Sequence, residues 1–284
     1  MIDPADSKQL DLLLRRHRID LKHRLGQNFL IDPSVRDAVA GAAGLDPDDD
    51  VLEVGAGVGT LTVALAPLCR KLTAVEIDGR LVPALRDTTA GFGNVEIVRS
   101  DILRFNVRSA FPQGGEVVAG NIPYNVTGAL VRKLLDVEPR PRRLSLVVQK
   151  EVAERWTAST GASLSTVAVQ VFAQARLVFS IPATAFNPPP RVDSALVALE
   201  VRSRPAVDVD DLDRFFRFVE SIFQFRRKQL GGALGRLAGA AGVGGTAAAA
   251  RLGAMGIDPT RRAQTLSLME WEALYRGFSP GAGG

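Results

Sequence analysis

The stretch VLEVGAGVGTLT, residues 51–62, decides the fold. Its first four residues form a short apolar run that is typical of a buried strand, and a helical pattern begins at residue 61. Three glycines, Gly55, Gly57 and Gly59, lie between these two elements. Because glycine permits positive φ and lets the backbone approach a ligand closely, the loop is predicted to cradle a ligand.

The same alternation of short apolar runs and helical patterns continues on the carboxyl side of this loop. Repeated strand, helix, strand units indicate a parallel, doubly wound sheet of the α/β class. The strands are predicted at residues 51–54, 72–75, 95–98, 117–119 and 144–148, and the helices at residues 61–65, 79–89, 126–137 and 151–158.

The pattern changes in the last third of the chain. Two further strands, at residues 176–181 and 195–201, are joined by the proline-rich AFNPPPRVDS with no helix between them, which favours antiparallel strands at the sheet edge. From Val209 onward the pattern is helical, so we predict an α/β domain over residues 1–207 and a small all-α domain over residues 208–284. The Gly/Ala-rich residues 231–253 fit either close packing of small-residue helices or a flexible connection.

Composition narrows the class of protein. Of the 284 residues, 46% are hydrophobic and 23% are charged, which is ordinary for a globular chain with a substantial core. The single cysteine, Cys69, cannot form an intramolecular disulfide, and the sequence contains neither a secretory signal nor a run of about 18 apolar residues. We therefore expect a cytoplasmic protein.

A basic segment, RRHRIDLKHR at residues 15–24, contains five Lys or Arg residues and both histidines against one acid. Such a segment attracts phosphates, so nucleic acid is a candidate partner. A solvated face of an N-terminal helix explains the same pattern.

Acidic residues follow the next two predicted strands and complete a candidate cofactor site. A glycine loop alone also suits nicotinamide and flavin cofactors, but Thr60 stands where the dinucleotide fingerprint needs glycine, so the spacing favours the methyltransferase version. Glu76 is placed to accept hydrogen bonds from both hydroxyls of a ribose, and Asp101 to accept one from an adenine amino group. Asp101 is also explained as a turn or N-cap residue. The predicted cofactor contacts from these segments are Gly55, Gly57, Glu76, Ile77, Asp101 and Ile102.

The segment Asn121-Ile122-Pro123-Tyr124 follows the fourth predicted strand and resembles the (Asn/Asp)-Pro-Pro-Tyr signature of methyltransferases that modify amino groups conjugated to planar rings. The lone pair of such a nitrogen is delocalised into its ring, which makes it a poor nucleophile. The side-chain oxygen of Asn121 and the backbone carbonyl of Ile122 can accept hydrogen bonds from the two N–H groups of this amine and so orient the nitrogen. Tyr124 supplies a ring on which the target base can stack.

Further segments extend this resemblance over most of the chain. They are KHRLGQNFL at residues 22–30, VVQKEVAERW at 147–156, FNPPPRVDSA at 186–195, FRRKQL at 225–230 and RAQTLSLMEW at 262–271. Together with the motifs above, they make the chain similar to the ribosomal RNA adenine N6,N6-dimethyltransferase family, and within it to the bacterial members that act on the small subunit. Two segments depart from the family pattern: residues 161–165, which lack an aromatic residue, and the Gly/Ala-rich residues 231–253.

The resemblance implies a monomeric class I methyltransferase that uses S-adenosylmethionine and requires no metal. Its substrate would be two adjacent adenines near the 3′ end of 16S rRNA, in the 30S subunit or its precursor. By the same resemblance, Asn28 and Leu30 join Asn121 at the methionine end of the cofactor, and Phe186 forms the second wall of the adenine pocket, opposite Tyr124. The resemblance also assigns cofactor binding and catalysis to the first domain and rRNA binding to the second, with RNA contacts from Arg24, Arg226, Arg227 and Lys228.

Three other functions remain open from the sequence. The first is the related methylase of large-subunit rRNA that confers antibiotic resistance; Leu25-Gly26 before Gln27 and the FRRKQL segment favour the small-subunit enzyme. The second is a dinucleotide-dependent oxidoreductase, against which Thr60 and the residues 121–124 argue. The third is a non-catalytic ribosome assembly factor, although every candidate catalytic residue is present.

Overall fold

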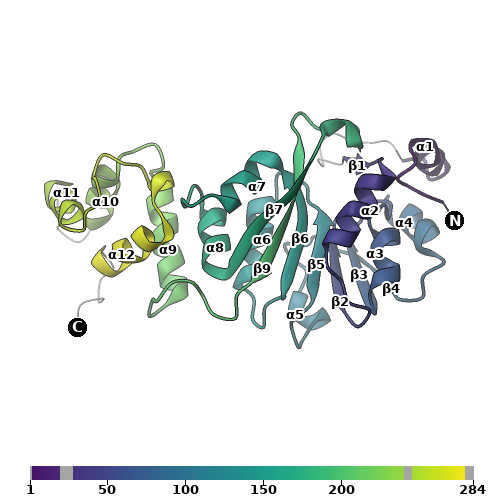
Figure 1. Ribbon diagram of the computed structural model, residues 1–284, viewed down its shortest axis with the longest axis horizontal. Helices are drawn as coiled ribbons and strands as arrows, with labels where there is room; N and C mark the ends of the chain where they lie inside the picture. Colours follow the sequence, from purple (N-terminus) through teal and green to yellow (C-terminus); the bar gives the residue numbers. More distant parts are fainter. Residues whose placement is uncertain (1, 20–27, 240–244, 279–284) are drawn as a thin grey trace. The chain divides into compact units, whose positions relative to one another are not determined.

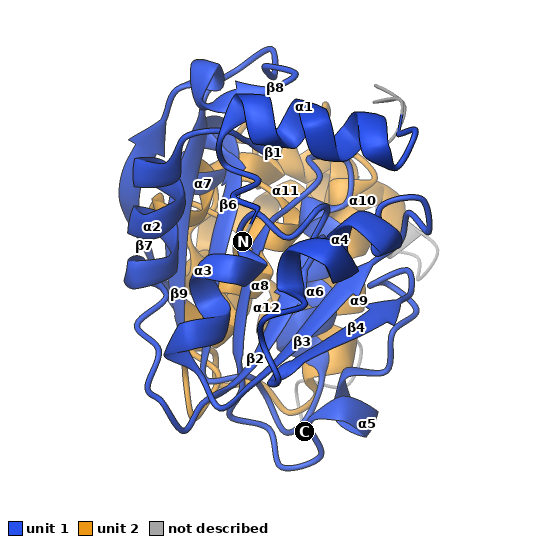
Figure 2. Ribbon diagram, turned by 90° about the vertical axis from the view of Figure 1, so that its right-hand side faces the viewer, with its two compact units in different colours: residues 1–154, 174–201 blue, residues 155–173, 202–284 orange. Residues whose placement is uncertain are grey.

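The computed structural model describes residues 2–19, 28–239 and 245–278 (Figure 1). The chain divides into two compact units, coloured separately in Figure 2. The first unit comprises residues 1–154 and 174–201, and the second comprises residues 155–173 and 202–284. The expected domain boundary at residue 208 falls within the second unit, and residues 155–173, expected in the first domain, also belong to the second unit. The assignment of catalysis and RNA binding to separate domains stays a prediction.

A seven-stranded sheet forms the centre of the fold, in the order β4-β3-β2-β5-β6-β9-β7. Neighbouring strands from β4 to β6 are parallel, and β9 runs antiparallel to β6. The predicted doubly wound sheet with antiparallel edge strands is therefore confirmed. The strands are β2 Asp50–Val54, β3 Lys71–Glu76, β4 Val95–Arg99, β5 Val117–Asn121, β6 Arg143–Gln149, β7 Ala173–Ile181 and β9 Ser194–Val201.

The strand order reverses between β2 and β5. From β2 the chain builds β3 and β4 toward one edge, then returns to place β5 and β6 on the other side of β2. Connections that leave neighbouring strands in opposite directions open a crevice at their carboxyl ends, where ligands bind in open α/β sheets. The cofactor loop follows β2, and the residues 121–124 begin at the end of β5, so both lie at this crevice.

Three helices of the first unit were not predicted at the positions where they lie: the two longer helices described next and the short α5, Val107–Ala110. Helix α1, Ser7–Arg16, begins after Asp6, whose carboxylate accepts hydrogen bonds from the amides of Lys8 and Gln9. Helix α2, Pro33–Ala42, begins after Asp32, which caps it in the same way and whose pKa is lowered by its hydrogen bond to the Ser34 hydroxyl. The remaining helices of this unit are α3 Thr62–Leu65, α4 Val82–Thr89 and α6 Thr127–Asp136, while α7 Lys150–Thr157 crosses the division between the units.

Helix α1 covers the outer side of the cofactor loop. Three of its leucines, Leu10, Leu13 and Leu14, are buried in a cluster with Phe29, with Val58 of the loop and with Leu81 beside α4. Of the basic segment that follows, Arg16 and His17 both contact Asp87 of α4, at 3.5 Å and 2.9 Å. Part of this segment is thus held against the protein, while residues 20–24 lie outside the described residues.

The second unit is helical, as predicted. Helix α8, Leu164–Phe172, contacts α9, Leu212–Phe223, and α12, Leu268–Phe278. Aromatic rings fill its core: Phe215 lies 5.5 Å from Tyr275, and Phe172 lies 5.6 Å from Phe216. This packing explains why residues 155–173 group with the carboxyl-terminal part of the chain.

The Gly/Ala-rich segment forms two helices of this unit, α10 Leu230–Gly239 and α11 Gly245–Ala254, which pack against each other. A Cβ added at Gly231 would lie 3.6 Å from the Cβ of Ala249 and 3.3 Å from Pro259. Of the two interpretations, close packing of small-residue helices therefore applies to the described part of the segment. Within the described residues, no helix has the length and apolar character needed to cross a membrane.

Candidate active site

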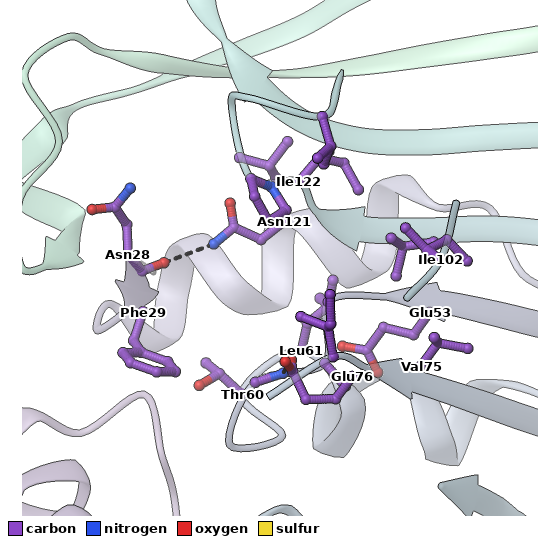
Figure 3. A pocket seen from close by; sticks show the side chains of 18 of the residues that line it. Asn28, Phe29, Glu53, Thr60, Leu61, Val75, Glu76, Ile102, Asn121 and Ile122 are labelled. Atoms are coloured by element: carbon purple, nitrogen blue, oxygen red, sulfur yellow. Dashed lines mark hydrogen bonds between the residues drawn. The ribbon is translucent and has the colours of Figure 1, made fainter. Parts of the chain in front are cut away.

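A pocket opens at the carboxyl ends of the central strands of the first unit (Figure 3). The structure brings together in its lining every residue that the sequence predicted for catalysis or cofactor binding. They are Asn28, Leu30, Gly55, Gly57, Glu76, Ile77, Asp101, Ile102, Asn121, Ile122, Tyr124 and Phe186. Their individual roles stay predictions.

The glycine loop adopts the backbone conformation that the sequence predicted. Gly55 and Gly57 have φ values of 73° and 60°, in the left-handed region that side chains disfavour. The amides of Gly55 and Ala56 donate to the carbonyl of Val75 at 2.9 Å and 3.2 Å, which fastens the loop to β3. A Cβ at Gly57 would lie 3.1 Å from the ring of Phe29, so the loop also has little room for a side chain.

Glu76, the last residue of β3, is almost fully buried in the pocket wall. Its Oε2 accepts a hydrogen bond from the Gly57 amide at 2.8 Å, and its Oε1 accepts one from the Asp78 amide at 2.7 Å. Burial raises the pKa of this carboxyl group, and the amide bonds partly oppose that effect. The two bonds fix the carboxylate against the glycine loop, in the position predicted for ribose recognition.

Asp101 combines the two interpretations that the sequence left open. Its Oδ1 accepts a hydrogen bond from the Leu103 amide at 2.9 Å and so forms a turn after β4, yet the residue also lines the pocket. Ile77 and Ile102 supply apolar surface beside it. Ile77 is 55% exposed, which is unusual for an isoleucine and places it at the pocket rim.

Asn121 ends β5 and contacts a segment far away in the sequence. Its Nδ2 donates to the backbone carbonyl of Asn28 at 2.8 Å, and Figure 3 marks this bond with a dashed line. A carbonyl only accepts, so this contact fixes which end of the amide is the nitrogen and leaves Oδ1 as the acceptor. The Ile122 amide donates to the carbonyl of Val147 in β6 at 3.0 Å, which holds the loop to the sheet.

Two aromatic side chains line the same pocket. Tyr124 is partly buried, and its hydroxyl lies 2.7 Å from the hydroxyl of Ser194, at the start of β9. Burial raises the pKa of the Tyr124 phenol, so the ring is neutral at physiological pH. Phe186 is only 2% exposed and belongs to β8, Phe186–Asn187, which pairs antiparallel with β1, Phe29–Leu30.

Glu53 and Thr60 line the pocket but were not predicted as site residues. Burial raises the pKa of Glu53 to about 7, and the charge of Glu76 adds to this shift. Within the described residues, Glu53 Oε2 and Thr60 Oγ1 are buried without a hydrogen-bond partner. Orphaned polar atoms in a pocket wall fit a polar ligand. The sequence held one signal for Glu53, an acid inside an otherwise apolar strand.

Three of the four predicted RNA-binding residues are described by the structure, and none of the three lines this pocket. Arg226, Arg227 and Lys228 are exposed in the turn between α9 and α10, in the second unit. Arg24 falls outside the described residues.

Comparison with known proteins gives one family. The sequence profile of the ribosomal RNA adenine dimethylase family matches residues 18–273. Ribosomal RNA small subunit methyltransferase A of Pelotomaculum thermopropionicum is 42% identical to the chain, and the alignment covers 100% of both.

Solved structures of the same kind are also similar. The crystal structure of 23S rRNA methyltransferase ErmE is 30% identical with a TM-score of 0.67, covering 89% of this chain and 100% of that one. A dimethyladenosine transferase from Plasmodium falciparum is 25% identical with a TM-score of 0.69, covering 87% and 96%. The predicted class I methyltransferase fold and the predicted family are thereby confirmed. The chain belongs to the ribosomal RNA adenine dimethylase family.

Proposed function

We propose that this chain is an S-adenosylmethionine-dependent enzyme that dimethylates N6 of two adjacent adenines near the 3′ end of 16S rRNA. One observation carries the proposal: the Asn121 to Tyr124 loop lines the same pocket as Glu76 and Asp101. This shared lining supports a site for an exocyclic amine next to a site for an adenosine-containing cofactor in a chain of this family. The name of the Pelotomaculum relative supports the small subunit as the target.

The pocket wall divides into parts that suit the parts of the cofactor. The Glu76 carboxylate binds the ribose hydroxyls, Asp101 binds the adenine amino group, and Ile77 and Ile102 cover the adenine faces. Asn28, Leu30, Gly55 and Gly57 enclose the methionine end, where Glu53 and Thr60 offer polar atoms that have no partner among the described residues. When bound, S-adenosylmethionine supplies an electrophilic methyl group on its sulfonium.

The residues 121–124 orient the amine that receives this methyl group. Oδ1 of Asn121 and the backbone carbonyl of Ile122 accept hydrogen bonds from the two N–H groups of the adenine amine. These two bonds draw the lone pair of the nitrogen away from the ring. Tyr124 and Phe186 stack on the two faces of the base, a contact that contributes about 1–3 kcal/mol per base. The methylated nitrogen is acidic enough to release its proton to water or a nearby carbonyl, so the scheme needs no strong base.

RNA binding is assigned to the exposed cations of the second unit, Arg226, Arg227 and Lys228, together with Arg24 of the first. We propose that the protein acts as a monomer in the cytoplasm, on the 30S subunit or its precursor. A further role in subunit maturation follows from binding such a particle.

The proposal is tested with labelled S-adenosylmethionine and ribosomal particles that lack the modification. We expect label in 30S subunits, with mass spectrometry placing two methyl groups on each of two adjacent adenines. Label in 30S subunits at any other nucleotide would contradict the assigned substrate.

Large-subunit rRNA is the second candidate substrate, because the 23S rRNA methyltransferase ErmE is 30% identical to the chain. The same assay with unmodified 50S subunits or protein-free 23S rRNA decides between the two. Label in 23S rRNA and none in 30S subunits would establish the second candidate. If neither 30S subunits nor 23S rRNA is labelled while calorimetry detects cofactor binding, the chain is a methyltransferase that acts on another substrate.

A further inference from the structure

The segment between Phe186 and Ser194 reaches both aromatic side chains of the pocket. At one end it contains Phe186 itself, held by the pairing of β8 with β1. At the other end, Ser194 contacts the hydroxyl of Tyr124, which lies 70 residues away in the sequence. Nothing in the function proposed above uses Ser194.

Ser194 is fixed far more firmly than an ordinary surface serine. It has no exposed surface and is paired with Gln149 in the antiparallel ladder of β6 and β9. The preceding residue, Asp193, is held twice: its carbonyl accepts from the Lys150 amide at 3.0 Å, and its Oδ1 accepts from the Ala183 amide at 3.0 Å. The Ser194 hydroxyl is therefore a rigid anchor point.

Tyr124, by contrast, lies in a loop whose backbone is fixed, and its aromatic ring extends away from that backbone. The Ile122 amide is bonded to β6, and the Val126 amide donates to the Pro123 carbonyl at 3.1 Å, so the backbone is held on both sides of Tyr124. The ring can still change rotamer about its Cα–Cβ bond. The contact with Ser194, 2.7 Å between hydroxyl oxygens, restrains the far end of the ring.

We propose that Ser194 is a positioning residue, which fixes the plane of the Tyr124 ring and thereby the plane in which the target base stacks. The inference rests on the proposed function, in which Tyr124 stacks on adenine. Because a reacting amine must lie within a few tenths of an ångström of its productive position, a loosened ring reduces turnover more than it reduces cofactor binding.

The test combines three variants of the full-length chain, Ser194→Ala, Tyr124→Phe and the double variant. Ser194→Ala is expected to lower kcat for RNA methylation about fivefold and to leave the Kd for S-adenosylhomocysteine unchanged, which is the loss typical of one hydrogen bond. Tyr124→Phe removes the other hydroxyl of the same pair, so it should give the same loss, and the double variant should lose no more than either single one.

Ser145→Ala is the matched control. Ser145 is also buried in a strand of the same sheet, but within the described residues its hydroxyl has no partner. Ser145→Ala should therefore keep the wild-type kcat. If Ser194→Ala also kept it, or if the losses of Ser194→Ala and Tyr124→Phe multiplied in the double variant, the proposal would be overturned.

An NMR measurement separates this proposal from the proposed function. The chain contains two tyrosines, so tyrosine labelled with ¹³C at Cζ gives one resonance for Tyr124 and one for Tyr275. Ser194→Ala should shift the Tyr124 resonance and leave that of Tyr275 in place; an unmoved Tyr124 resonance would overturn the contact. If Ser194→Ala shifts the Tyr124 resonance but the wild-type chain transfers no methyl group to RNA, the proposed function is refuted and the positioning role with it, while the contact itself stands.

Discussion

Asn121 uses the two ends of its amide for different purposes. The nitrogen donates to the backbone carbonyl of Asn28, and the oxygen remains as an acceptor in the pocket. Such an arrangement orients the acceptor before any substrate arrives, so no free energy is spent on ordering it during the reaction. Glu76 is prepared in a comparable way by the amides of Gly57 and Asp78.

Replacing Asn121 by alanine should remove methyl transfer and leave RNA binding nearly intact. The change removes the acceptor for the amine and the donor to Asn28, and losses for one such group in an active site are about 10² to 10³ in kcat. Transfer of labelled methyl groups and filter binding of RNA measure the two properties separately. Asn106→Ala, which removes only the cap of α5, should lower stability and spare kcat. Equal loss of transfer and RNA binding in Asn121→Ala would refute the assigned role.

Glu53 makes stability depend on pH in a direction opposite to that of most paired carboxylates. Its pKa is near 4.5 in the unfolded chain and about 7 in the folded one, because burial disfavours the charge. Between these values the folded state binds more protons, so stability falls as pH rises from 4.5 to 7 and the loss persists above 7.

Glu53→Gln is neutral at every pH and should escape this loss. The difference in Tm between the variant and the wild type should increase by a few degrees between pH 4.5 and 7 and stay constant above pH 7. Calorimetry at a series of pH values measures this difference. Glu138→Gln is the control, because Glu138 is a surface carboxylate that is 64% exposed. A Tm difference between Glu53→Gln and wild type that does not change with pH would show that Glu53 is not a buried, protonated acid.

The longer the apolar run or helical repeat of a secondary-structure element, the better its position was predicted from the sequence. The five parallel strands and the antiparallel strand β9 were predicted within a few residues, since each contains a short, largely apolar run. Strands β1 and β8 contain two residues each and pair Phe29 with Asn187, so no local period could reveal them. An N-terminal helix was considered only for the basic residues 15–24, whereas α1 begins earlier and its helical spacing lies in the apolar residues Leu10, Leu13 and Leu14.

Site residues were likewise predictable where the sequence alone marks them. Residues that belong to recognisable motifs, such as Glu76 and Asn121, were predicted and lie in its lining. Thr60 and Ser194 also lie in quoted segments but were not predicted as site residues, because what distinguishes them is a missing or a distant hydrogen-bond partner, and that exists only after the chain has folded.

The glycine loop is the element that ties backbone conformation to cofactor binding. Gly57→Ala places a Cβ 3.1 Å from the Phe29 ring at a φ of 60°, and a loop that moves to relieve this contact and the backbone strain disturbs the bond from the Gly57 amide to the Glu76 carboxylate. We expect binding of S-adenosylhomocysteine to weaken about tenfold, measured by isothermal titration calorimetry, as for the loss of one charge-assisted hydrogen bond.

Gly115→Ala separates strain from contact. Gly115 has a φ of 76°, but a Cβ there would meet no atom within 4 Å. It should therefore cost a comparable amount of backbone strain, about 1 kcal/mol, and leave cofactor affinity at the wild-type value. Weaker binding in both variants would show that general loss of stability, rather than the loop, controls affinity.

For the molecule as a whole, the net charge of +4 says little, and the distribution of charge says more. Some cations of the first unit are already engaged: Arg70 pairs with Asp50 at 3.0 Å and Lys71 with Glu96 at 2.8 Å. The exposed cations between α9 and α10 are the ones that we assign to RNA.

Changing Arg226, Arg227 and Lys228 to glutamine should weaken RNA binding and flatten its dependence on salt. Each lost phosphate contact lowers the magnitude of the slope of log K against log salt by about 0.7 to 0.9, so three contacts lower it by about 2 to 3. Fluorescence anisotropy over a range of salt concentrations measures the slope. The variant that combines Arg70→Gln and Lys71→Gln removes paired cations and should keep the wild-type slope. An unchanged slope in the triple variant would mean that those residues serve only the helical unit.

The bond from Asn121 to Asn28 constrains how members of this family can diverge. The signature that Asn121 begins accepts either asparagine or aspartate, but an ionised aspartate has only acceptor oxygens. Placed in this chain, it would turn a carboxylate oxygen toward the Asn28 carbonyl and repel it. Exchange at residue 121 therefore requires a coordinated change in the path of residues 28–30, so the two segments should covary among homologues, although 93 positions separate them.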